Sequence, residues 1–207
     1  MLETLLAPPP STLLAFAGAG ILLNLTPGAD VMFATASGVR GGAKAGIAAA
    51  AGVALGSVFH VTLAVLGVAA ALRAMPEALT VIRWAGAAYL LWLAYAAWTA
   101  KPDTGNAGGA GSLGQALRRG FVTNLLNPKV GLFILAFLPQ FADPGLGPVA
   151  PQMAVLGAIF IFTGLIITSA YGALAGVFGT ALRRHQRFTN RIAAAVFGGL
   201  AARLVLD

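Results

Sequence analysis

The chain is built from long apolar runs that no charged residue interrupts. Residues 4–29 and 45–72 contain no Asp, Glu, Lys or Arg, and residues 120–142 contain only Lys129. A bilayer core of about 30 Å is crossed by about 20 helical residues, so these runs predict membrane-spanning helices. Only 9% of the 207 residues are charged, whereas a soluble domain has about 25%. We expect an all-α integral membrane protein.

Three more apolar segments complete the expected set of spans. Residues 84–100 form a shorter run rich in Trp and Tyr, and residues 188–206 form the weakest run. Residues 144–182 open with PGLGPVAP, a turn sequence that cannot begin a helix before about Pro148. We therefore predict a single span from there to about Phe178, and six transmembrane helices in the whole chain.

Basic residues are divided unequally between the segments that connect these spans. Those after odd-numbered spans are Arg40, Lys44, Lys101, Arg118, Arg119, Arg183, Arg184, Arg187 and Arg191. Those after even-numbered spans are Arg73, Arg83 and Arg203. The positive-inside rule then places both termini outside the cell. The opening MLETLLAPPP has an acid where a secretory signal has basic residues, so we predict no cleaved signal peptide.

The chain divides into two halves of three spans each. Between them lies AKPDTGNAGGAGSL, a Gly-rich stretch that predicts a flexible linker. We expect a first three-helix repeat over residues 1–100, a cytoplasmic linker over 101–112 and a second repeat over 113–207. Because three is odd, a second half that resembles the first must lie upside down in the membrane. The predicted fold is two inverted three-helix repeats.

Spans one and four carry matching interruptions. The first contains NLTPGAD, residues 24–30, and the fourth contains NLLNPKV, residues 124–130. Proline has no N–H for the carbonyl four residues earlier, so Pro27 frees the carbonyl of Leu23 and Pro128 frees that of Asn124. We predict that helices 1 and 4 are broken here. Thr26-Pro27 and Asn127-Pro128 read as N-caps followed by proline at the first helical position.

The two breaks suggest a binding site for a zwitterion. A helix that restarts presents free N–H groups and its positive dipole end, which suit a carboxylate. Lys129 would add a positive charge, and Asp30 is an acid suited to an ammonium group or a proton. Two plainer interpretations stay open. Each break can be a structural kink, and Asp30 and Lys129 can simply neutralise one another.

Other polar and small residues carry weaker signals. His60, deep in the second span, can relay protons or can bond to a neighbouring helix. The fifth span has a polar side that lines a cavity or bridges helices, formed by Thr163, Thr168, Ser169 and Tyr171. We expect three glycines of the second span to serve close helix packing: Gly46, Gly52 and Gly56.

The motifs NLTPGAD, MFATASGVRGGAKAG and GFVTNLLNPKVGLFILAFLPQF resemble those of the lysine exporter superfamily, especially its homoserine and threonine exporter branch. The resemblance covers nearly the whole chain. It implies a bacterial inner-membrane exporter of amino acids or related metabolites that is driven by the proton gradient. Ala29 stands where the commonest motif, NLTPGPD, has proline, which makes the break after Gly28 less rigid.

The motifs also indicate the functional residues. The expected substrate-binding residues are Asn24, Thr26, Pro27, Gly28, Asn124, Asn127, Pro128 and Lys129. Asp30 is the expected proton-coupling residue, with His60 as a second candidate, and Gln140 belongs to the same stretch without an assigned role. Expected partners are an amino-acid-like substrate, protons and membrane lipid, and a homodimer is left open.

Several function classes fit the sequence less well. No GxxxxGK[ST] is present, so the chain does not read as an ATP-driven pump. The spans lack a dense group of His and carboxylates, so we expect no enzyme, no cofactor and no metal site. The basic clusters lie between apolar runs and read as topology signals, so we expect no nucleic-acid partner. The alternative we retain is a passive channel for small polar solutes.

Overall fold

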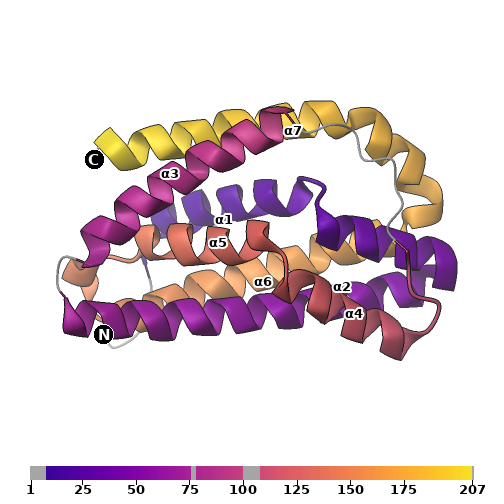
Figure 1. The fold of residues 1–207 in the computed structure, drawn as a ribbon, viewed down its shortest axis with the longest axis horizontal. Helices are drawn as coiled ribbons and strands as arrows, with labels where there is room; N and C mark the ends of the chain where they lie inside the picture. The colour runs from indigo at the N-terminus through magenta and orange to yellow at the C-terminus, as the bar shows by residue number, and fades with distance from the viewer. Residues whose placement is uncertain (1–7, 76–77, 100–107, 207) are drawn as a thin grey trace.

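The structure, a computed structural model, describes residues 8–75, 78–99 and 108–206, and these ranges hold helices and loops without a strand. The predicted all-α class is therefore confirmed for the described chain. The α-helices are α1 (Pro10–Leu25), α2 (Ala29–Ala74), α3 (Ala78–Thr99), α4 (Leu113–Leu125), α5 (Pro128–Phe137), α6 (Val149–Ala173) and α7 (Ala175–Leu206). Two short 3₁₀ helices, η2 (Leu138–Phe141) and η3 (Pro144–Leu146), connect α5 to α6. Figure 1 shows their arrangement.

Several helices have the length and composition of membrane spans. Among the described residues, Ala29–Ala71 and Val149–Ala173 are each long and apolar enough to cross a bilayer. A third candidate is the pair Leu113–Leu125 and Pro128–Phe141, which is bent by 54° at its break. The shorter α1 is also apolar. These lengths and compositions are typical of a membrane protein.

Helix α2 consists of two helices joined at Gly42. This residue has φ 76°, in the left-handed region that glycine adopts without steric penalty. Figure 1 shows that α2 folds back on itself, so that its second part runs toward the opposite end of the molecule. The part before Gly42 continues in the direction of α1. The long apolar stretch from Ala29 onward is thus divided by a single glycine.

Both predicted breaks are present. Helix α5 begins at Pro128 with Asn127 as its N-cap, and the Asn127 side chain accepts a hydrogen bond from the Lys129 N–H, as predicted. The predicted cap at Thr26-Pro27 is wrong. Helix α2 begins at Ala29 with Gly28 as its N-cap, because the Thr26 hydroxyl donates back to the Leu22 carbonyl at 2.7 Å. Thr26 therefore completes the end of α1.

The predicted fifth span ends earlier than expected. Helix α6 begins at Val149, directly after Pro148, as predicted, but it ends at Ala173 and not near Phe178. Just before this end, Gly172 packs against the backbone of Gly46, where an added Cβ would lie 2.7 Å from the Gly46 carbonyl carbon. The chain then turns at Leu174 and continues as α7. The end of α6 thus lies beside a tertiary contact, and no local turn sequence predicts it.

Close glycine contacts hold α2 against α4 and α6, as predicted. Gly46 meets Gly172 of α6, and Gly52 meets the Leu117 carbonyl of α4. A Cβ at Gly56 would lie 2.6 Å from the Asn124 Oδ1. Backbones can approach this closely only where side chains are absent. These contacts bring α4, and with it the second break, beside α2.

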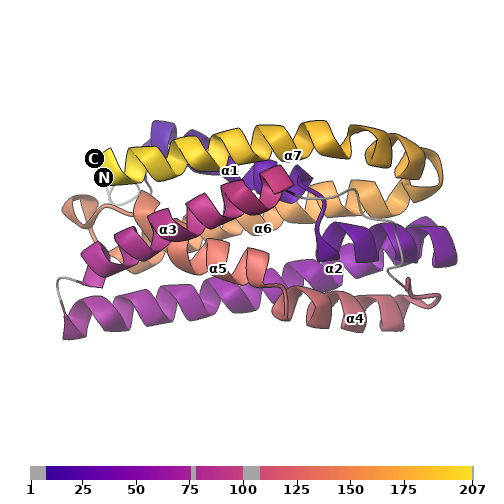
Figure 2. The ribbon, with the colours of Figure 1, turned by 45° about the horizontal axis from the view of Figure 1, so that its top comes forward.

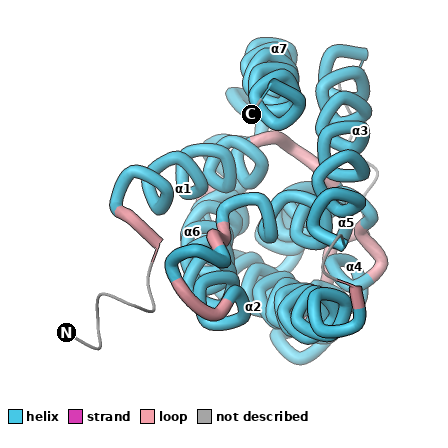
Figure 3. Tube along the Cα trace, turned by 90° about the vertical axis from the view of Figure 1, so that its left-hand side faces the viewer, coloured by secondary structure: helices cyan, strands magenta, loops and turns pink. Residues whose placement is uncertain are grey.

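The remaining helices complete the bundle. Figure 3 shows α3 and α7 side by side, away from α2. The largest fully buried side chains of the core include Phe16 of α1, Phe133 and Phe137 of α5, and Phe197 of α7. Residues just before α4 also pack inward, because the Ala110 N–H donates to the Ser37 Oγ at 3.1 Å. The rest of the predicted linker, residues 101–107, lies outside the described chain.

Candidate functional site

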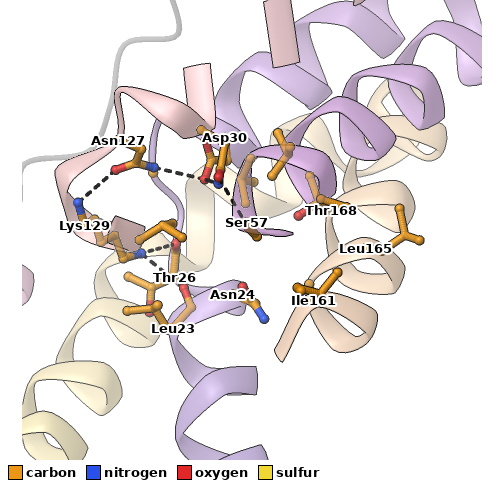
Figure 4. A pocket seen from close by; sticks show the side chains of 17 residues that line it. Leu23, Asn24, Thr26, Asp30, Ser57, Asn127, Lys129, Ile161, Leu165 and Thr168 are labelled. Atoms are coloured by element: carbon orange, nitrogen blue, oxygen red, sulfur yellow. Dashed lines mark hydrogen bonds between the residues drawn. The ribbon is translucent and has the colours of Figure 1, made fainter. Parts of the chain in front are cut away.

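The two helix breaks meet at a cavity inside the bundle (Figure 4). Its volume is about 30 Å³. From the first break it is lined by Leu23, Asn24, Thr26, Gly28, Asp30 and Val31, and from the second by Asn124, Asn127, Lys129 and Val130. Val53, Ala54 and Ser57 of α2 and Ile161, Gly164, Leu165 and Thr168 of α6 complete the wall. Most of the predicted site residues thus lie around one cavity.

Asp30 is held in the cavity wall by two amides from the second break. Its side chain is only 8% exposed, and its Oδ2 accepts from the Asn124 Nδ2 at 2.9 Å and from the Asn127 Nδ2 at 3.0 Å. Asn124 is itself held by Ser57, whose hydroxyl donates to the Asn124 Oδ1 at 3.4 Å. The second carboxylate oxygen, Oδ1, is buried without a hydrogen-bond partner. Asp30 therefore offers one open acceptor.

Lys129 closes the end of the first broken helix. Its Nζ donates to the Leu23 carbonyl at 3.1 Å and to the Thr26 carbonyl at 2.9 Å. The Leu23 carbonyl is the one that Pro27 frees, and carbonyls at a helix C-terminus carry partial negative charge. Because Lys129 bonds to carbonyls and Asp30 bonds to amides, the two charged groups have separate partners. Two of the three ammonium donors of Lys129 are used in this way.

The carbonyl of Asn124, which Pro128 frees, also lies beside a polar side chain from another helix. The His60 Nε2 lies 3.1 Å from the Asn124 carbonyl oxygen, and the Asn127 N–H donates to the same oxygen at 2.9 Å. His60 thus makes the bond to a neighbouring helix that its plainer interpretation expects. It does not belong to the residues that line the cavity. A role for His60 in proton transfer remains a prediction.

Two tyrosines, which the sequence analysis did not include among the binding residues, form hydrogen bonds with backbone carbonyls at the two breaks. The Tyr89 hydroxyl of α3 lies within 3.2 Å of both the Pro128 and the Lys129 carbonyls, and the Tyr171 hydroxyl donates to the Leu25 carbonyl at 3.1 Å. Tyr89 lies in a Trp- and Tyr-rich run, so its local sequence resembles an interface anchor. A carbonyl that a proline or a helix end leaves free inside a membrane needs a donor from elsewhere in the protein. The positions of the prolines could therefore have predicted that side chains such as these tyrosines donate to the freed carbonyls.

The other predicted polar residues divide into two groups. Thr168 is buried and lines the cavity. Thr163 bonds to carbonyls of its own helix, and the Gln140 Nε2 donates to the Ala136 carbonyl at 3.2 Å. Neither Thr163 nor Gln140 lines the cavity. The polar side of α6 therefore contributes to the site mainly through Thr168.

The cavity is small, and charged and polar side chains line part of it. One water needs about 10–15 Å³ on this scale, so 30 Å³ holds about two or three waters and no amino acid. A carboxylate with an open oxygen and an ammonium group face the same small space from opposite breaks. Binding a larger zwitterion at this point requires the surrounding helices to separate.

Comparisons with known proteins agree with the membrane architecture. The family model described as LysE type translocator matches residues 21–207, which include both breaks. An uncharacterized membrane protein of Vibrio cholerae serotype O1 is 31% identical over 190 residues, which cover 90% of this chain and 92% of that protein. None of the solved structures matches the chain at a significant level.

Two further relatives are named as efflux proteins and not as enzymes. A leucine efflux protein of Enterobacter sp. is 31% identical over 188 residues, covering 87% of this chain and 88% of the relative. A homoserine/homoserine lactone efflux protein of Salmonella typhimurium is 31% identical over 156 residues, covering 74% and 75%. With a family model matched over most of its length, the chain belongs to the LysE type translocators.

Proposed function

We propose that this protein exports an amino acid or a related small metabolite from the cytoplasm across the bacterial inner membrane, in exchange for protons. The observation that carries the proposal is the open Oδ1 of Asp30, a buried acid in a cavity where two broken helices meet. An intramembrane acid is costly in lipid and is a candidate for substrate or proton binding by default. The efflux names of the relatives support the same direction of transport.

The proposed topology has six spans in two inverted repeats. In the first half the spans are α1 with the start of α2, the rest of α2, and α3. In the second they are α4 with α5, α6, and α7. The corresponding positions of the two breaks support this repeat, and α1 begins at the end of the molecule where α7 ends (Figures 1 and 2). An even number of spans places both termini on one side.

The basic residues support an orientation with both termini outside. Arg40 donates to the Gly109 carbonyl just before α4 at 3.1 Å, and the Arg119 guanidinium lies 5.1 Å from the centre of the Phe33 ring. The two arginines therefore gather where α2 turns and α4 begins. By the positive-inside rule this end of the molecule faces the cytoplasm.

The transport cycle follows from competition at Asp30. In an inward-open state the ammonium of the substrate binds the Asp30 carboxylate, while its carboxylate faces Lys129 and the starts of α2 and α5. A proton that arrives from outside binds the same carboxylate and displaces the substrate outward. The closed cavity corresponds to an intermediate between the two open states. Coupling arises because Asp30 holds either the substrate or a proton.

Transport by purified protein in proteoliposomes tests the proposal. With L-leucine and L-homoserine as probes, we expect saturable flux, and accumulation against a concentration gradient when a pH gradient is imposed. A protonophore should abolish the accumulation. Flux that rises linearly with concentration and never exceeds equilibrium would contradict coupled transport. That outcome would favour the passive channel for small polar solutes.

A further inference from the structure

Two unpartnered polar atoms line the same cavity. In the part of the chain that the structure describes, the buried side-chain atoms without a hydrogen-bond partner are the Asn24 Nδ2, the Asp30 Oδ1 and the Thr35 Oγ1. Asn24 and Asp30 line the cavity, and Thr35 does not. Buried polar groups nearly always have partners in native proteins. The cavity therefore presents an open donor and an open acceptor, which suit a ligand that carries both complementary groups and displaces the two or three waters that the cavity can hold.

The two asparagines that begin the matching motifs are used differently. Asn124 is 1% exposed, and its side chain is occupied by Asp30 and Ser57. Asn24 heads the first motif, and the structure shows no acid bound to its amide nitrogen. Protein structure alone therefore explains the side chain of Asn124 and leaves the amide donor of Asn24 without a partner.

The surroundings of Asn24 suit an anionic group. The carbonyls of Leu23 and Thr26, on either side of Asn24 in the chain, both bind the Lys129 ammonium, so a positive charge lies at this end of the cavity. Across from Asn24 stands Gly164, where an added Cβ would lie 3.2 Å from the Asn24 Nδ2. Figure 4 shows Asn24 and Asp30 on the first break, with Ile161 and Thr168 of α6 across from them.

We infer that the Asn24 amide is a specificity-determining donor that binds a carboxylate oxygen of the substrate, while the Asp30 Oδ1 binds its ammonium group. This inference rests on the proposed function. The two contacts fix the amino acid by both of its charged ends. The side chain of the substrate then faces the apolar wall of Val53, Ile161 and Leu165. A neutral aliphatic amino acid has a carboxylate for Asn24, an ammonium group for Asp30 and an apolar side chain for this wall. L-Leucine is therefore a suitable probe.

Introducing a negative charge at position 24 tests the inference. We compare wild type with Asn24→Asp in proteoliposomes, using L-leucine and L-leucinamide, which replaces the carboxylate by a neutral amide. Wild type should prefer leucine. Asn24→Asp removes the donor and repels a carboxylate, so kcat/KM for leucine should fall about ten- to a hundredfold. Leucinamide can donate to the new carboxylate, so the leucine-to-leucinamide ratio should fall at least about tenfold.

Matched variants keep the result specific. Thr35→Val removes the third unpartnered polar atom, which lies outside the cavity wall, and should leave both substrates unchanged. Asn24→Ser keeps a donor and should lie between wild type and Asn24→Asp. If Asn24→Asp does not fold, the same comparison is made with Asn24→Ser, which should still lower the ratio.

The outcomes separate this inference from the proposed function. An unchanged leucine-to-leucinamide ratio in a folded Asn24 variant overturns the role of Asn24 while leaving export intact. Equal transport of the two probes by wild type overturns it as well. If wild type carries neither probe nor any other amino acid, the proposed function itself fails.

Discussion

Replacing Asp30 by asparagine is expected to abolish proton-coupled export while the protein still inserts and folds. The amide of the new residue keeps an oxygen for Asn124 and Asn127, which now donate to the Asp30 Oδ2 at 2.9 and 3.0 Å. The open position loses its negative charge, so it no longer binds an ammonium group or a proton. Loss of one partner of a buried charge pair costs about 2–5 kcal/mol, which predicts a fall in kcat/KM of roughly 30-fold or more.

The measurement is pH-driven uptake or export in proteoliposomes at matched protein levels. The control is Asp143→Asn. Asp143 lies between η2 and η3, where its side chain accepts a hydrogen bond from the Gly145 N–H, and an asparagine can accept the same bond. We expect this control to transport like wild type. Unchanged pH-driven transport by Asp30→Asn would rule out the assignment of Asp30.

The second large effect is expected for Lys129→Met. This substitution removes the donors that bind the Leu23 and Thr26 carbonyls, and it leaves Asp30 as a buried charge without its positive neighbour. Leaving a buried carbonyl without its hydrogen-bond donor costs about 1–3 kcal/mol, and this substitution does so at two carbonyls. We therefore expect a clearly lower melting temperature in detergent and little export.

The double variant Asp30→Asn/Lys129→Met separates charge balance from transport. In Lys129→Met the buried carboxylate of Asp30 has lost its positive neighbour, and the double variant no longer contains that carboxylate. The double variant should therefore melt at a higher temperature than Lys129→Met alone. It should nevertheless fail to export, because the binding acid is gone. Wild-type export by the double variant would mean that the two residues only neutralise one another.

The helix breaks could be predicted from the sequence because proline acts locally. Pro27 and Pro128 each remove one N–H from an apolar run, and the structure breaks at both places. The exact start of α2 could not be predicted in the same way. Thr26 has the chemistry of an N-cap, but its hydroxyl bonds to Leu22 of the preceding helix. Two competing partners for one hydroxyl cannot be ranked from the sequence.

The features that could not be predicted from the sequence depend on tertiary contacts. Helix α6 ends beside the packing of Gly172 on Gly46, and no proline or polar turn marks that end. Tyr89 reaches the carbonyls of Pro128 and Lys129 from another helix, and this depends on how α3 packs on α5. The sequence indicated most of the polar residues that line the cavity, whereas the direction of each side chain depends on the packing of the whole bundle.

Protection of a single introduced thiol tests most directly whether the cavity is the transport site. The chain contains no cysteine, so Thr168→Cys places the sole thiol in the cavity wall, and Thr99→Cys places one on the exposed end of α3. The rate of modification by a small thiol reagent is measured with increasing L-leucine. We expect slower modification at position 168, half-maximal near the transport KM, and no change at position 99. An unchanged rate at position 168 under saturating, actively transported leucine would contradict it.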